Sequence, residues 1–143
     1  MLHSDQVRKR SSNNVRRRGV LQSCLSPNSV SEPTWLTMYI PDRDESGNKV
    51  NVAYWIAATC QLLAHRFGGA TVSPAYTGYW HNPGSGQLVK ERTFTVSCCI
   101  DNADFHEHAA ALERHIKRFG RTTNQGEVMI TIGASVLRYT NFD

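Results

Sequence analysis

The stretch HRFGGATVSPAYTGYWHNPGSGQLVKERTFTVSCCI, residues 65–100, decides the predicted fold. It indicates the end of an amphipathic helix, a double-glycine stop, a strand running to Trp80, a glycine-rich hairpin loop and a long strand. From Phe94 to Ile100, apolar side chains alternate with small polar ones. Such alternation is typical of a strand with one face on a core, so the stretch predicts a sheet covered by helices.

The flanking segments extend this pattern. Asn51 is a good helix N-cap, and apolar stripes at helical spacing follow it and recur before Gly120. The predicted strands are residues 34–41, 70–80, 87–100 and 127–132, and the predicted helices are residues 51–67 and 103–119; a final segment spans residues 136–142. This β-α-β-β-α-β order predicts a ferredoxin-like α+β domain over residues 34–143, a four-stranded antiparallel sheet with two helices on one face.

Residues 1–33 differ from the rest in composition and charge. They contain almost no apolar periodicity, which predicts a disordered tail. Residues 1–20 hold six Lys or Arg and one Asp, a net charge of +5, whereas the other 123 residues hold ten basic and eleven acidic side chains. The tail could contact nucleic acid through its basic triplets, or it could be only solvated. The candidate residues are Arg8, Lys9, Arg10, Arg16, Arg17 and Arg18.

Cysteine spacing and hydropathy bear on the compartment. Cys24, Cys60, Cys98 and Cys99 form no C-x-x-C pair, so free thiols in a reducing compartment are expected. No apolar run is long enough for a signal peptide or a membrane span. We therefore predict a cytoplasmic protein without membrane contact. No phosphate-binding or nucleophile motif is present, so no cofactor is predicted.

Several of these residues also form a pattern seen elsewhere. The chain resembles a group of small uncharacterised bacterial proteins, classed only as a domain of unknown function, over roughly residues 35–132. The matching positions are Arg66, Phe67, Gly68, Gly69, Thr71, Gly78, Trp80, Glu91, Phe119 and Gln125. The resemblance implies a ferredoxin-like fold and brings no activity or cofactor with it.

One charged pair is the main candidate for a site. Glu91 opens the long strand, and Arg66 ends the first helix. They could pair and hold the helix end to the sheet, or they could face a ligand. In the second case the speculative ligand-binding residues are His65, Arg66, Trp80, His81, Glu91 and Arg92. Metal binding is not predicted, because the histidines of the second predicted helix are too far apart for one ion.

Three functional hypotheses follow. The favoured one is a binding or regulatory module without catalytic chemistry, because no convergent acid–base set is visible. We expect it to be a homodimer that pairs through the outward sheet face of Trp35 and Tyr39. The first alternative is a small hydrolase-type enzyme with its site near Arg66, Trp80 and Glu91. The second is a nucleic-acid-associated protein that uses the basic tail.

Overall fold

The computed structural model describes residues 33–143. Apart from Pro33, the predicted tail lies outside the described residues, together with its six candidate nucleic-acid contacts from Arg8 to Arg18. Within residues 33–143, neither helix combines the length and the apolar character that crossing a membrane would require.

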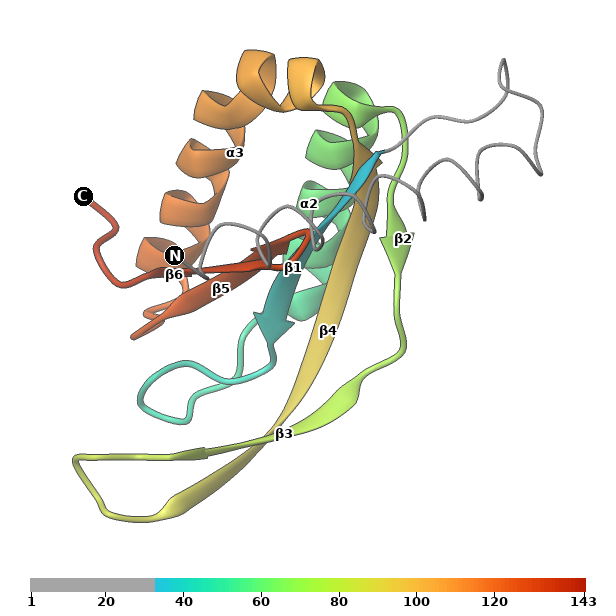
Figure 1. The fold of residues 1–143 in the computed structure, drawn as a ribbon. Coiled ribbons are helices and arrows are strands. Elements are labelled where there is room, and N and C mark those ends of the chain that lie inside the picture. The colour runs from blue at the N-terminus through green and yellow to red at the C-terminus, as the bar shows by residue number, and fades with distance from the viewer. Residues whose placement is uncertain (1–32) are drawn as a thin grey trace, which may run out of the picture. The chain divides into compact units, whose positions relative to one another are not determined.

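The described chain folds as an α+β domain with two helices and one antiparallel sheet of six strands. The elements, in chain order, are β1 (Thr34–Pro41), α2 (Val52–Phe67), β2 (Thr71–Val72), β3 (Tyr76–His81), β4 (Leu88–Ile100), α3 (Asn102–Thr122), β5 (Val128–Ile132) and β6 (Ser135–Tyr139). The strand order is β2-β4-β1-β5-β6, and β3 also pairs with β4. Figure 1 shows α2 and α3 together on one face of this sheet.

The predicted sheet of four strands was too small. Residues 70–80 form two strands instead of one, because Pro74 lacks the N–H that a continuous ladder needs. Both pieces pair with β4, β2 near Ser97 and β3 near Glu91. The last segment adds β6, which pairs with β5 across the turn at Gly133 (φ 58°).

The core lies between the sheet and the two helices. On β1 and β4, Leu36, Met38, Ile40, Val96 and Cys98 are buried, as the alternation predicted. The helices add Trp55, Leu63, Leu112, Ile116 and Phe119. The intervening side chains point to the opposite face, where the Thr37 and Ser97 hydroxyls are hydrogen-bonded at 2.9 Å. Among residues 33–143, no helix covers this face, and we call it the open face.

The helix ends show one correct prediction and one wrong one. As predicted, the Asn51 side chain accepts a hydrogen bond from the backbone of Tyr54, and α2 ends at Gly68 in the left-handed region (φ 90°). Gly120, however, does not end α3, which continues to Thr122. A glycine is needed at position 120 for space, since a Cβ there would collide with the Phe142 ring.

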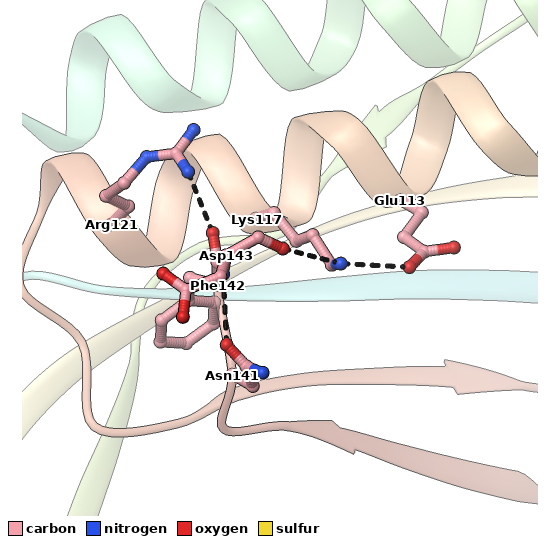
Figure 2. Close-up of polar contacts among 6 residues, drawn as sticks. All are labelled: Glu113, Lys117, Arg121, Asn141, Phe142 and Asp143. Atoms are coloured by element: carbon pink, nitrogen blue, oxygen red, sulfur yellow. Dashed lines mark hydrogen bonds and ion pairs between the residues drawn. The ribbon is translucent and has the colours of Figure 1, made fainter.

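Residues 141–143 pack along α3 (Figure 2). Arg121 donates a hydrogen bond to the carbonyl of Phe142, and Lys117 donates one to the carbonyl of Asp143, both at 2.9 Å. Lys117 also lies 3.4 Å from the Glu113 carboxylate. This segment thus fixes the position of α3 from the side that carries Gly120.

Candidate functional site

A cleft of about 780 Å³ lies on the open face of the sheet. Its walls come from β1, the loop that follows β1, the β3–β4 hairpin and the β5–β6 edge. The β4 strand pairs with β1 only from Thr93 onward, so its first residues extend beyond the end of β1 (Figure 1). Asp42, directly after β1, holds the start of this extension. Its backbone N–H donates to the carbonyl of Arg92, and its carboxylate accepts from the Arg92 N–H.

Glu91 is the acid of this cleft that projects from β4, and both of its carboxylate oxygens are hydrogen-bonded. The indole Nε1 of Trp80 donates to Glu91 Oε2 at 3.2 Å, and the Thr93 hydroxyl donates to Oε1 at 3.5 Å. Each carboxylate oxygen therefore has its own donor, one from β3 and one from β4. The side chain is held in one orientation at the floor of the cleft.

Burial raises the pKa of the Glu91 carboxyl, and the negative charge of Asp42 adds to the rise. The hydrogen bonds from Trp80 and Thr93 act in the opposite direction because they favour the carboxylate, but they do not cancel it. A positioned carboxyl with a raised pKa is suited to accept a proton or to face a cation.

Gly78 leaves room above this carboxyl. It lies directly opposite Glu91 in the β3–β4 register, on the same face of the sheet. A Cβ at position 78 would lie 3.1 Å from Thr93 Oγ1 and 3.3 Å from Glu91 Cγ. Any larger residue would press on the carboxyl and its hydroxyl donor, so the glycine serves the site.

The rest of the cleft is aromatic and charged. Tyr39, Tyr76 and Trp80 supply aromatic rings. The acidic lining residues are Asp44, Glu45, Glu91 and Glu127, against Arg43 and Arg138. Arg138 is already paired with Glu127, so the remaining charge of the cleft is negative.

The six predicted ligand-binding residues do not form one site. Trp80, His81 and Glu91 line the cleft. His65 and Arg66 line a different groove, between α2 and α3. Arg92 points to the other face of β4, with its guanidinium 5.3 Å from the centre of the Phe94 ring.

The predicted pairing of Arg66 with Glu91 is wrong. The chain leaves α2 and enters β2 opposite Ser97, six residues along β4 from Glu91, which is about 20 Å at strand rise. Arg66 instead donates to His108 at 3.5 Å. The cleft residues that sequence reasoning did not assign to a site, Tyr39, Tyr76 and Thr93, share a face with Glu91 and could have been found only from the strand register.

The histidines of α3 are also separated. His115 is buried against Thr59, whereas His108 contacts Arg66 and Phe67. Among residues 33–143, no three His, Cys, Asp or Glu side chains come together as a metal site would require.

No protein-family model matches the sequence, and neither does any curated protein. Two solved structures share the fold. One is a phage SAM lyase in complex with S-methyl-5'-thioadenosine, with a TM-score of 0.58 and 17% identity; the other is a phage SAM lyase in the apo state, with a TM-score of 0.57 and 16% identity. Each match covers 79% of this chain and 97% of the solved chain.

These two structures overturn the favoured functional hypothesis. A binding or regulatory module without catalytic chemistry was expected, but the fold that the chain shares is that of a lyase. The alternative of a small hydrolase-type enzyme with its site near Arg66, Trp80 and Glu91 agrees better with the comparison in being an enzyme, although Arg66 lies outside the cleft.

Proposed function

We propose that this chain is a lyase that cleaves S-adenosylmethionine (SAM) in the open-face cleft, with Glu91 as its central acid. The observation that carries the proposal is the held Glu91 carboxyl in a negatively charged aromatic cleft. The shared fold supports it, because the match extends over 97% of the phage SAM lyase chain.

The cleft suits the chemistry of SAM. The substrate has a planar adenine ring and a positively charged sulfonium. Tyr39, Tyr76 and Trp80 offer ring faces and edges on which a base can stack. The excess of carboxylates attracts a cation, and the attraction is strengthened where the cleft excludes water.

The reaction proposed is the loss of methylthioadenosine from SAM. The bond between sulfur and the γ-carbon breaks, and its electron pair moves to sulfur, which changes from a sulfonium to a neutral thioether. No water is consumed, so the four-carbon fragment must supply its own electrons. Either its carboxylate oxygen attacks the γ-carbon and forms a lactone, or a proton leaves the β-carbon and a double bond forms.

Glu91 has a role in each route. In the elimination, the carboxylate accepts the β-proton, and its raised pKa favours that transfer. In the lactonisation no proton is lost, and the carboxylate holds the cationic substrate in the reactive conformation. The two products are isomers of equal mass, and proton NMR distinguishes the routes because only the elimination product carries vinyl protons.

The test is the conversion of SAM to methylthioadenosine by the full chain, followed by chromatography. We expect Glu91→Gln to lower the rate by about 100-fold or more, since loss of a positioned proton acceptor costs 10²–10⁴-fold. The matched control is Glu107→Gln, which removes the same charge from an exposed position on α3. If the wild-type chain forms no methylthioadenosine, or if both variants keep full activity, the proposal is wrong.

We also propose that the sheet is an extended ferredoxin-like sheet. The path β5-β1-β4, continued by β2 and β3, has the strand order of a split βαβ arrangement, and β6 is an addition at its edge. The homodimer stays a prediction. Exposed Trp35 on the open face supports it, and the solution mass of the full chain tests it.

A further inference from the structure

The groove between α2 and α3 lies on the opposite side of the domain from the cleft and is of similar size, about 760 Å³. Its α2 wall includes Tyr54, Ala57, Gln61, His65 and Arg66. Its α3 wall consists of His108, His115 and Arg118. No carboxylate lines it: α2 carries no acidic residue, and Asp104, Glu107 and Glu113 of α3 lie outside the groove.

Arg66 and Arg118 lie at opposite ends of the groove. The helices run antiparallel, since Trp55 contacts His115 and Phe119 while Phe67 contacts His108. Arg66 therefore lies at one end, and Arg118 lies at the other, beside Trp55. The eleven residues from position 55 to position 66 correspond to about 16 Å along α2.

Both guanidinium groups are positioned without being neutralised. Arg118 lies over the Trp55 ring, 5.4 Å from its centre, and Arg66 donates to His108 Nδ1 at 3.5 Å. Among residues 33–143, neither arginine forms an ion pair with a carboxylate. Guanidinium groups held in this way are ready to form paired hydrogen bonds to an oxyanion.

The floor of the groove adds no charge of its own. The Thr59 hydroxyl donates to the carbonyl of Trp55 at 2.7 Å, so the hydrogen of its 2.9 Å bond to His115 must come from His115 Nε2. His115 is thus the neutral Nε2–H tautomer, and its Nδ1 is free to accept a hydrogen bond. The charge available to a ligand comes from the arginines at the two ends.

We propose that this groove binds a small polyphosphorylated molecule, whose anionic groups contact Arg66 at one end and Arg118 at the other. A single phosphate is too short to reach both ends, whereas a chain of linked phosphates, alone or on a nucleoside, can approach both. The open middle of the groove, at Ala57 and Ala58, leaves space for it. This site is independent of the cleft and of its proposed reaction.

The experiment is calorimetric titration of the full chain with tripolyphosphate, ATP and inorganic phosphate at constant salt. We expect tripolyphosphate and ATP to bind at least tenfold more tightly than inorganic phosphate. Arg66→Gln and Arg118→Gln should each weaken tripolyphosphate binding by about tenfold, the effect of one charge-assisted hydrogen bond. The matched control, Arg114→Gln, removes an exposed α3 charge outside the groove and should change the affinity less than twofold.

A second variant protects the test against a change in folding. Ala57→Glu places a carboxylate in the exposed middle of the groove and leaves both arginines in the sequence, and it should abolish binding by repelling the phosphates. The proposal is overturned if Arg114→Gln weakens binding as much as Arg66→Gln, if Ala57→Glu binds normally, or if tripolyphosphate binds no better than phosphate. It is also overturned if a single-stranded oligonucleotide binds more than tenfold tighter than ATP, since the occupant would then be nucleic acid.

Discussion

The open-face cleft and the helix groove have nearly the same volume, 780 and 760 Å³, but they differ in how their charges are held. In the cleft, polar side chains are hydrogen-bonded to one another, as Trp80 and Thr93 are to the Glu91 carboxylate. In the groove, Arg66 and Arg118 are oriented by uncharged partners and keep their full charge. If the two proposals hold, the cleft is a preorganised reaction site and the groove on the other side of the domain is an anion site.

The two regions also share one property. Burial favours the uncharged form of the central group in each, because it raises the pKa of Glu91 and lowers the pKa of His115 to about 4. Arg118 adds to the second shift by repelling a protonated imidazole. As the pH falls, Glu91 is neutralised earlier than an ordinary glutamate, and the cleft loses negative charge. His115 gains its positive charge only near pH 4, so the groove changes charge later than an ordinary histidine would allow.

The largest effect that separates the regions is expected from Gly78→Ala. The new methyl group would press on Thr93 Oγ1 and Glu91 Cγ and displace the carboxyl. Displacement of a reacting group by about 1 Å costs about 100-fold in rate, and here the neighbours must move by a few tenths of an ångström. SAM turnover should fall by about 10- to 100-fold while the affinity of the groove for tripolyphosphate is unchanged. Equal activity of the variant and the wild type would show that the space above Glu91 is not needed.

A smaller effect is expected from Gly120→Ala, which acts on α3 without touching either lining. The added Cβ would collide with Phe142 and displace the segment shown in Figure 2. Overpacking of this kind costs about 1–3 kcal/mol in the free energy of unfolding, measured by denaturant titration. Restoring space with the double change Gly120→Ala and Phe142→Ala should recover part of the loss. A single variant as stable as the wild type would contradict the packing described.

A further effect, spread over a range of pH, is a pH dependence of stability from His115. The unfolded chain binds a proton here below the ordinary pKa of 6.5, whereas the folded chain binds it only below a pKa of about 4. More protons are therefore bound in the unfolded state within this window, and the free energy of unfolding should fall as pH decreases from 6.5 to 4. His115→Gln should flatten this slope in denaturant titrations at several pH values. A slope identical to that of the wild type would assign the dependence to other groups.

Much of the fold could be predicted because its signals are local. The Asn51 cap, the Gly68 stop and the alternation of β4 each depend on neighbours within a few residues, and the structure confirms them. The errors arise where distant segments decide the outcome. Gly120 stays inside α3 because Phe142 and Thr123 support the last turn, and no local pattern reports that contact.

The candidate site, too, could be predicted only where its residues are close together in the sequence. The sequence predicts Trp80 and Glu91 as candidates, and these residues lie on one hairpin; Gly78, opposite Glu91, was not predicted as part of the site. Arg66 was assigned to the same site only because it precedes that hairpin in the chain. After α2 the chain instead joins β4 opposite Ser97, about 20 Å along that strand from Glu91, and the packing of α2 on α3 brings Arg66 to His108.

The sequence by itself determined the α+β class, most of the helix and strand positions and the candidate acid, because hydrophobic periodicity, capping and turn chemistry operate over short stretches of chain. Only the tertiary structure decided which side chains meet: Glu91 with Trp80 and Thr93 on the open face, and Arg66 with His108 in the helix groove. The physical reason is that strand register and helix packing are set by long-range burial of the core, which depends on the whole chain at once.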